Sequence, residues 1–274
     1  MNTCLIVDVS CLCHRAYHKL NALAFEEEPT GVLFGFFRSL QKLTTDHEQD
    51  VVSFCYDSRE SKRREIYPAY KARSHDADEQ ARRSVLHKQI DRLPGLLGEM
   101  GYRNGYHQPG YEADDLITAI CKARPQGRNI IISSDRDLYQ CLNIGTWIWN
   151  GTKRVTYKSF IDKYMINPDQ WWRVLALAGG HDNIPGVPGV GVETALRYIR
   201  GGLDSNSKKC RAIEAHATEL RLYRQLVRLP YPGTVVRPLV ADAVTDAAWD
   251  AVVGRLGMHT LKRSRRRRAK THQT

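Results

Sequence analysis

The sequence predicts an α/β protein built on a mainly parallel sheet that helices cover on both faces. Three apolar runs carry this prediction: residues 4–8, 50–57 and 129–135 each read as a short strand that ends in an aspartate. The runs are apolar throughout instead of alternating with polar residues, which is typical of parallel strands buried on both faces. The helical stretches between them fit right-handed crossovers from one strand to the next.

The ends of these strands bring carboxylates to one place. Asp8, Asp57 and Asp135 each follow an apolar run, and Asp137 lies two residues further on. The carboxyl ends of parallel strands meet at one edge of a sheet, where ligand crevices form. We therefore expect these four side chains to gather at that edge.

A second acidic group stands at Gly110–Asp115, directly before the apolar run 116–120. If a helix begins near Ala113, Glu112 and Asp115 share one face, and Asp114 is turned away from it. Helix capping alone explains one or two acids in a first turn. Capping does not explain three carboxylates that join the strand-end aspartates, because such crowding calls for cations. Oxygen-only ligands select Mg²⁺ or Mn²⁺ rather than zinc.

A basic segment leaves the same edge after Asp57. Residues 58–92 contain ten lysines and arginines with Tyr67 and Tyr70 between them. A run of charge is usually a solvated helix face. Here its position beside the acids, and its aromatic rings, favour phosphate binding with base stacking. Residues 74–80 are polar, and we expect them to be mobile.

The other predicted elements follow from periodicity and from glycine and proline. We expect helices at 31–44, 157–164, from Pro168 through Leu177, from Thr194, at 210–226 and from Ala247, and an edge strand at 146–149. Residues 182–195 alternate glycine with apolar residues and lead into a helix. Such a hairpin can hold a phosphate with backbone N–H groups, and a plain loop is the alternative.

Composition excludes several classes of protein. The chain has 274 residues, 42% hydrophobic content and a formal charge of +11, which favours a polyanionic partner. No apolar run approaches the roughly 18 residues of a membrane helix, so we expect a cytoplasmic protein without a membrane partner. Seven cysteines lack paired spacing and are expected to be reduced, and Cys11, Cys13 and His14 make only a weak zinc motif. Residues 262–270 read as a basic, disordered arm.

Four motifs, which appear along the chain in the family's order, resemble the 5′ nuclease superfamily. This superfamily comprises flap endonucleases, phage 5′-3′ exonucleases and the amino-terminal 5′-3′ exonuclease domain of DNA polymerase I. The motifs are Gly-Tyr-Glu-Ala-Asp-Asp at 110–115, Ser-Ser-Asp-Arg-Asp-Leu at 133–138, Tyr-Pro-Ala-Tyr-Lys-Ala-Arg at 67–73 and Asp-Asn-Ile-Pro-Gly-Val-Pro-Gly-Val-Gly at 182–191. The resemblance covers about residues 3 to 200.

The resemblance implies a PIN-like α/β core with a helical arch and a helix-hairpin-helix (H3TH) region that grips duplex DNA around a K⁺ ion. It divides the chain into a catalytic domain at 1–156 with its arch at about 58–92, a helical DNA-binding region at 157–261, and a basic disordered tail at 262–274.

The resemblance also implies roles for matching residues. Two Mg²⁺ ions, replaceable by Mn²⁺, are implied, with Asp8, Asp57, Glu112, Asp114 and Asp115 serving the first directly or through water, and Asp135, Asp137 and Asp182 the second. Lys71 and Arg73 match a catalytic pair that steers the scissile phosphate. The residues implied to contact DNA are Arg63, Arg64, Tyr70, Gly186, Gly189, Val190, Gly191 and Thr194. Tyr70 is expected to stack on a terminal base.

Two departures from the family pattern bear on these roles. Members of the family usually have the sequence Gly-Asp-x-x-Asp-Asn before Ile-Pro-Gly. In this chain Gly179 occupies the position of the first aspartate. His181 is a candidate replacement, because imidazole accepts Mn²⁺ more readily than Mg²⁺, and a plain loop residue is the alternative. Glu193 replaces a frequent lysine, which weakens the expected grip on duplex DNA.

Together these features predict a monomeric, structure-specific 5′-3′ exonuclease or flap endonuclease that acts on DNA 5′ ends, 5′ flaps or RNA–DNA primer junctions. Two-metal hydrolysis is the expected chemistry. The alternative is a branched-DNA-binding protein whose second metal site is degenerate. A third candidate, an RNA-cutting PIN-type toxin or RNase, is disfavoured by the hairpin at 184–191.

Overall fold

The computed structural model of the chain describes residues 2–20, 22–72 and 76–263. The fold is mixed α/β with mainly parallel strands, as predicted. Contacts divide the described residues into two units, 57–72 with 107–236, and 2–20 and 22–56 with 76–106 and 237–263. The domain boundary predicted between residues 156 and 157 stays a prediction.

In the unit that contains residues 2–56, three strands pair in parallel. β1 (Thr3–Asp8) pairs with β4 (Val51–Cys55), and β4 pairs with β5 (Asn104–Tyr106). Every residue of β1 and β4 is buried, which confirms that continuous apolar runs mark strands covered on both faces. β5 was not predicted, because its three residues, Asn-Gly-Tyr, carry no apolar run.

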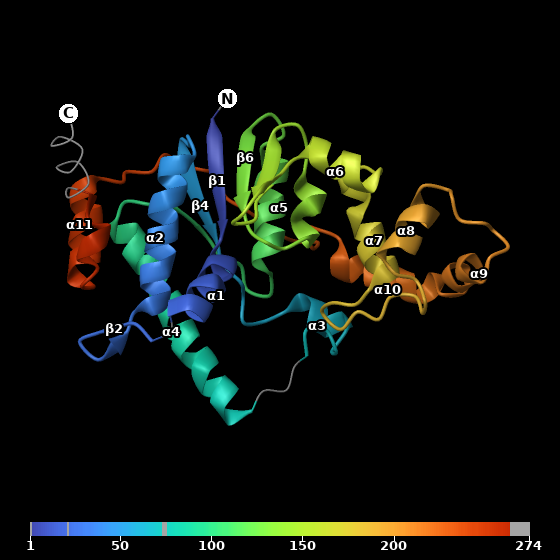
Figure 1. Cartoon of the computed structure of the whole chain (residues 1–274), viewed down its shortest axis with the longest axis horizontal. Helices are drawn as coiled ribbons and strands as arrows, with labels where there is room; N and C mark the ends of the chain where they lie inside the picture. The colour runs from blue at the N-terminus through green and yellow to red at the C-terminus, as the bar shows by residue number, and fades with distance from the viewer. Residues whose placement is uncertain (1, 21, 73–75, 264–274) are drawn as a thin grey trace. The chain divides into compact units, whose positions relative to one another are not determined.

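Helices and short elements complete this unit. They are α1 (Val9–Leu20), the hairpin of β2 (Ala24–Phe25) and β3 (Glu28–Pro29), α2 (Gly31–Asp46), α4 (Ala77–Glu99), α11 (Asp246–Arg255) and the 3₁₀ turn η3 (His259–Leu261). α1 and α2 pack side by side (Figure 1), and Gly35 permits this, because a Cβ there would lie 2.5 Å from that of Ala16. The helices predicted at 31–44 and from Ala247 are confirmed.

The start of α4 corrects one expectation. Residues 77–80 were expected to be mobile, but they form the first turn of this helix. The Asp76 carboxylate accepts the N–H of Glu79 at 2.7 Å and so caps the turn. Asp78 and Glu79 also suit the positive end of the helix dipole. The acidic residues that made this stretch look like a loop are therefore its helix-start signal.

A carboxyl-terminal segment is fastened to β4 and β5 by two side chains. Asp242 accepts the N–H of Val52 at 2.8 Å and that of Arg103 at 2.9 Å. The fully buried amide of Asn104 donates to the carbonyl of Val240 at 2.8 Å and accepts its N–H at 2.9 Å. Residues 240–242 thus satisfy strand groups that would otherwise lack partners.

The other unit contains three further strands. β6 (Arg128–Ile132) pairs in parallel with β7 (Thr146–Trp149), and β7 pairs antiparallel with β8 (Arg154–Val155). The predicted strand at 146–149 is therefore present but is not an edge strand, because β8 flanks it. The strand β8 was not predicted, because two residues are too few to show a period. Gly151, with a φ of 96°, lies in the turn that precedes it.

This unit also holds the remaining helices. They are α3 (Lys62–Ile66), α5 (Ala113–Ala123), the 3₁₀ turn η1 (Asp137–Cys141), α6 (Tyr157–Tyr164), the 3₁₀ turn η2 (Pro168–Gln170), α7 (Trp171–Ala178), α8 (Val192–Ile199), α9 (Lys208–Ala215) and α10 (Ala217–Val227). The helix predicted at 210–226 is broken at His216 into α9 and α10. α7 packs against both α8 and α10 (Figure 1).

All seven cysteines are free thiols, and six are buried. Within the described residues, no helix combines the length and apolar character that crossing a bilayer requires. The cytoplasmic location stays a prediction.

Asp242→Ala tests the fastening of the carboxyl-terminal segment. It leaves the N–H groups of Val52 and Arg103 without their carboxylate acceptor, so we expect the free energy of unfolding to fall by about 2 to 3 kcal/mol. Urea denaturation followed by circular dichroism measures the change. The control is Glu48→Ala at an exposed position of the same unit, for which no comparable loss is expected.

Candidate metal and phosphate site

The acidic stretch 112–115 forms the amino-terminal end of α5, as predicted. Glu112 is the N-cap residue, and its N–H donates to Asp115 Oδ2 at 3.1 Å. The N–H of Ala113 donates to Asp57 Oδ1 at 2.8 Å. The first turn of α5 thus draws Asp57, which is distant in sequence, into the acidic cluster, and the helix dipole favours this placement.

Asp115 differs from its neighbours because it is fully buried in an ion pair. Both guanidinium NH groups of Arg63 donate to its two oxygens at 2.7 Å, and the N–H of Tyr231 donates to Oδ1 at 2.7 Å. With the Glu112 N–H, four donors occupy this carboxylate. Metal ligation by Asp115 therefore stays a prediction, and it would require one of these donors to leave.

Arg63 itself was predicted to contact DNA, but only 2% of its surface is exposed. Its Nε donates to the carbonyl of Leu226 at 2.8 Å, and its guanidinium lies 4.9 Å from the centre of the Tyr231 ring. Arg63 is therefore a buried counter-charge for the acidic cluster. The sequence could not reveal this, because Asp115 lies 52 positions away.

Lys71 lies beside the carboxylates of the acidic cluster, and its predicted catalytic role stays a prediction. Its ammonium contacts Glu112 Oε2 at 3.1 Å and Asp182 Oδ2 at 3.7 Å. Burial opposes the charge, but Glu112 and the other nearby acids outweigh it, so the pKa of Lys71 is raised. This side chain is 37% exposed, and it presents a fixed positive charge at the surface of the cluster.

Tyr70 does not fit its expected role. Its ring is 3% exposed and its hydroxyl donates to Glu112 Oε2 at 3.0 Å, so it offers no open face to a terminal base. Arg64 is exposed, and its guanidinium donates to the carbonyls of Tyr70 and Lys71 at 2.9 and 3.1 Å. Arg64 therefore supports the backbone that carries Lys71. Arg73 lies outside the described residues.

A loop at 181–183 clasps the segment that carries Lys71. The N–H of Lys71 donates to the carbonyl of Asp182 at 3.0 Å. The Asn183 amide donates to the carbonyls of Ala69 and Ala72 at 3.0 and 2.7 Å. Asp182 and Asn183 hold left-handed backbone conformations (φ of 52° and 59°), which aspartate and asparagine tolerate better than most residues. This clasp places Asp182 against Lys71.

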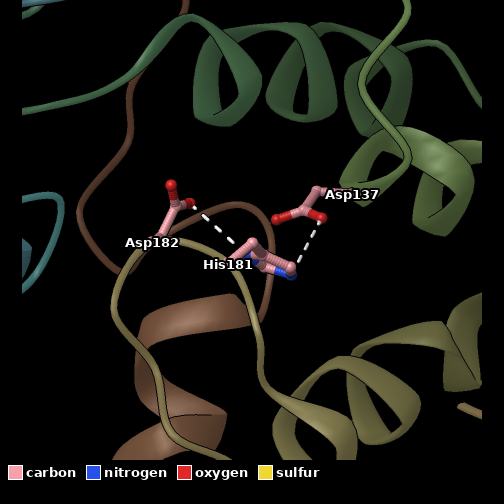
Figure 2. A group of neighbouring side chains, drawn as sticks. All are labelled: Asp137, His181 and Asp182. Carbon is pink, nitrogen blue, oxygen red and sulfur yellow. Dashed lines mark ion pairs between the residues drawn. The ribbon is translucent and has the colours of Figure 1, made fainter. Parts of the chain in front are cut away.

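The second acidic group contains Asp135, Asp137 and Asp182 with His181 between the last two (Figure 2). The N–H of Asp137 donates to Asp135 Oδ1 at 2.8 Å, so these acids share the turn after β6. His181 Nε2 lies 3.6 Å from Asp137 Oδ1, and Nδ1 lies 3.6 Å from Asp182 Oδ2. The ligand atoms of Asp137, His181 and Asp182 all lie within 4.8 Å of one another.

Crowding shifts two pKa values in this group. Burial and the like charge of Asp135 raise the pKa of Asp137 from 3.8 to about 7. The Asp182 carboxylate stabilises the charged imidazole of His181 and raises its pKa above 6.5, although burial opposes this. Both shifts express a shortage of positive charge, which a divalent cation relieves.

Two further residues, Asp8 and Asp114, were predicted as metal ligands. Asp8 belongs to the other unit, at the end of β1, where Oδ1 accepts the N–H of Cys11 at 2.9 Å and caps the start of α1. Asp114 is half-buried in the first turn of α5. Their membership of the metal site stays a prediction.

The predicted phosphate hairpin lies between α7 and α8. The N–H of Val187 donates to the carbonyl of Leu177 at 2.8 Å, and Gly191 is the N-cap residue of α8. Gly189 has a φ of 74°, and a Cβ at Gly189 or Gly191 would meet nothing within 4 Å. A phosphate backbone can therefore approach this turn closely.

Two other hairpin residues lie near this turn. Val190 is buried, and the hydroxyl of half-buried Thr194 accepts a hydrogen bond from Lys209 Nζ at 3.2 Å. Val190 thus supports the turn from within rather than facing a ligand. Lys209 was not singled out in the sequence, and it adds a cation at the start of α8.

The residues present suit Mg²⁺ or Mn²⁺. The carboxylates of Glu112, Asp135, Asp137 and Asp182 supply the oxygen donors that these ions prefer, and His181 adds one nitrogen. Such a site can polarise a phosphoryl oxygen and activate a water molecule.

Comparisons with known proteins identify the family of this chain. The family described as 5′-3′ exonuclease, N-terminal resolvase-like domain, matches residues 3–165. The thermostable DNA polymerase I of Thermus filiformis is 34% identical over 242 residues, which cover 82% of this chain and 28% of that protein. DNA polymerase I of Mycobacterium tuberculosis H37Rv is 33% identical over 211 residues, covering 72% and 23%. The chain thus spans about a quarter of the length of these relatives.

Solved structures share the fold. The T5 5′-exonuclease with bound divalent metal ions (zinc) is 20% identical with a TM-score of 0.71, and the match covers 83% of this chain and 90% of that one. The bacteriophage T5 flap endonuclease in complex with DNA and metal ions is 19% identical with a TM-score of 0.72, covering 96% and 97%. Human GEN1 in complex with Holliday junction DNA is 16% identical with a TM-score of 0.65, covering 93% and 67%.

Arg63→Ala tests the buried ion pair. It leaves the Asp115 carboxylate buried without its counter-charge, so we expect the free energy of unfolding to fall by about 3 to 5 kcal/mol. Denaturant unfolding measures the loss. Glu65→Ala, at an exposed position of the same helix, is the control; equal stability of the two variants would contradict the assignment.

The pKa shifts predict how the stability of the metal-free protein depends on pH. Folded Asp137 holds a proton between its usual pKa of 3.8 and about 7, and folded His181 holds one above 6.5, so the folded state binds more protons than the unfolded state. This contribution to stability is lost as pH rises through the raised values. We expect Asp137→Asn to become stabilising relative to wild type between pH 5 and 8, measured by urea unfolding in EDTA. A difference that is constant with pH would contradict the shift.

Proposed function

Because the chain belongs to the 5′-3′ exonuclease family, we propose that it is a divalent-metal-dependent nuclease that hydrolyses phosphodiester bonds near the 5′ ends of DNA. The observation that carries the proposal is the convergence of Glu112, Asp137 and Asp182 around Lys71 and His181 within one unit. A lysine held among carboxylates next to a glycine hairpin suits a phosphate ester better than any uncharged substrate.

The proposed site divides its carboxylates into two groups. Asp57, Glu112 and Asp114, with Asp8 and Asp115, serve one ion directly or through water, and Asp135, Asp137 and Asp182 serve the other. When bound, Mg²⁺ or Mn²⁺ ions supply a water molecule of lowered pKa and neutralise charge on the phosphate. Hydrogen bonds at the start of α5 and in the turn after β6 position Glu112, Asp135 and Asp137 for this role.

Lys71 is the residue proposed to touch the reacting group. Its ammonium lies beside Glu112 and Asp182, and the Asp182 carbonyl and Arg64 fix its backbone. A cation held in this way stabilises the charge that grows on the phosphate oxygens as the bond to the leaving 3′ oxygen breaks. Arg73 is proposed as its partner on the basis of the motif.

DNA with a 5′ end or a 5′ flap is the proposed substrate, and RNA–DNA primer junctions belong to the same class. The relative from bacteriophage T5 is a flap endonuclease in complex with DNA, which supports this choice. The hairpin at 186–191 is proposed to hold the phosphates of the duplex, with K⁺ as its ion. The predicted tail at 262–274, of which residues 264–274 lie outside the described part of the chain, has seven basic residues at 262–270, which suit sequence-independent binding by a monomer.

The alternative is a protein that binds branched DNA without cutting it. Gly179 favours this alternative, because it removes one carboxylate from the second group of the family pattern. The two functions differ in one respect: a binding protein shifts flap DNA on a gel but gives no product with any divalent ion. An RNase is disfavoured by the hairpin, which suits duplex DNA, and matched RNA and DNA flaps distinguish the two.

The test is product mapping on a 5′-labelled DNA flap with Mg²⁺ or with Mn²⁺. We expect divalent-dependent cleavage near the junction. Lys71→Ala should lower the single-turnover rate by roughly 10²-fold while flap binding is nearly retained, because Lys71 acts on charge that develops during the reaction. Lys158→Ala, at a site 85% exposed on α6, is the matched control. Cleavage that is equal in Lys71→Ala and wild type contradicts the assigned role, and no cleavage with either ion favours the binding protein.

A further inference from the structure

We infer that His181 is a metal ligand, and that with Asp137 and Asp182 it forms a mixed nitrogen and oxygen site that binds Mn²⁺ in preference to Mg²⁺. The inference rests on the proposed function, since it concerns the second of the two proposed ions. It goes beyond that function by assigning a ligand and a metal preference that belong to this chain.

The geometry brings three donors to one point (Figure 2). His181 Nε2 and Asp137 Oδ1 are 3.6 Å apart, and the Asp182 carboxylate lies on the other side of the imidazole, 3.6 Å from Nδ1. Donors that share one ion at about 2.1 Å lie roughly 3.0 to 3.4 Å from each other in tetrahedral or octahedral arrangements. Side-chain shifts of a few tenths of an ångström therefore suffice to close the pair of Nε2 and Oδ1 on an ion.

The state of Nε2 is the second observation. This ring nitrogen is buried, yet it makes no hydrogen bond within the described part of the chain, and its distance to Asp137 is too long for one. A buried polar atom without a partner is costly and rare in a folded protein. An ion between Nε2 and Asp137 would satisfy both groups. Asp182 on the Nδ1 side is placed to orient the ring, as carboxylates do for histidines that bind metals.

The backbone explains why a histidine takes this position. Gly179 has a φ of 54°, and a Cβ there would lie 2.4 Å from the Gly186 nitrogen and 2.5 Å from the Ile184 oxygen. The loop is held closed by a hydrogen bond of 2.9 Å from the Gly180 N–H to the Ile184 carbonyl. An aspartate at position 179 does not fit this loop. His181 is the side chain that the same loop directs toward Asp137.

The donor set determines the metal preference. Mg²⁺ is a hard cation that favours oxygen ligands and keeps much of its water, whereas imidazole suits first-row transition ions. Replacing one carboxylate by a neutral imidazole also removes negative charge, which weakens the attraction for Mg²⁺ most because that attraction is mainly electrostatic. The site should therefore favour Mn²⁺.

The direct test is pulsed electron paramagnetic resonance of Mn²⁺ bound to the full chain without DNA. Coupling to ¹⁴N of a coordinated imidazole is expected in wild type and should be absent in His181→Ala. His107→Ala, at an exposed histidine of the same unit, should keep it. No ¹⁴N coupling in folded wild type, or coupling that persists in His181→Ala, overturns the inference.

Affinity gives a second readout, by isothermal titration with Mn²⁺ or Mg²⁺ alone. Partners that merely orient a ligand are worth about 10- to 100-fold in metal affinity, so loss of the ligand in His181→Ala should weaken Mn²⁺ binding at one site by at least about 10-fold. His181→Glu makes an all-oxygen site of similar reach and should tighten Mg²⁺ binding while abolishing the ¹⁴N coupling. Unchanged Mn²⁺ affinity in His181→Ala, or Mg²⁺ binding that is not tightened in His181→Glu, counts against the inference.

Cleavage assays run in parallel separate this inference from the proposed function. Cleavage by a wild-type protein without ¹⁴N coupling would leave the nuclease proposal standing and remove His181 from the ligands. Coupling to ¹⁴N without any cleavage would keep His181 among the ligands and count against the nuclease proposal.

Discussion

The balance between carboxylates and cations around the start of α5 is the constraint on which the rest of the site depends. Glu112 and Asp115 open one helix, and like charges this close raise the free energy of the ionised state. Two cations, one buried and one partly exposed, offset this cost. Arg63 is buried and makes a bidentate pair with Asp115, whereas Lys71 is partly exposed and contacts Glu112 and Asp182. The buried cation stabilises the fold, and the exposed one remains accessible to a phosphate.

The loop between α7 and α8 serves both halves of the site. On one side Asp182 and Asn183 hold the backbone that carries Lys71. On the other side Gly189 and Gly191 leave the open turn that suits a phosphate. The open turn therefore lies on the same loop that positions Lys71. Burial and the like charge of Asp135 raise the pKa of Asp137; from this loop Asp182 adds to the rise, whereas His181 opposes it.

Local signals predicted the elements that carry this site. The apolar runs predicted β1, β4 and β6, and the acids before residue 116 predicted the start of α5. The helix at 157–164 was predicted to the residue, and in the structure Thr156 and Ser159 form a capping box at its start. The short strands β5 and β8 were not predicted, because they have too few residues to show a period. The break at His216 between α9 and α10 was also not predicted, because helical periodicity continues across it.

By itself the sequence determined the fold class, the set of acids and the glycine hairpin, because strand burial, helix starts and tight turns depend on neighbouring residues. Only the tertiary structure decided what each charged group does. Arg63 and Tyr70 were expected to contact DNA, but they lie buried against Asp115 and Glu112. For His181 the sequence left a metal ligand and a plain loop residue as alternatives, and in the structure its ring faces Asp137. These pairings join residues tens of positions apart, and burial and distance, which set the strength of an ionic contact, exist only once the chain has folded.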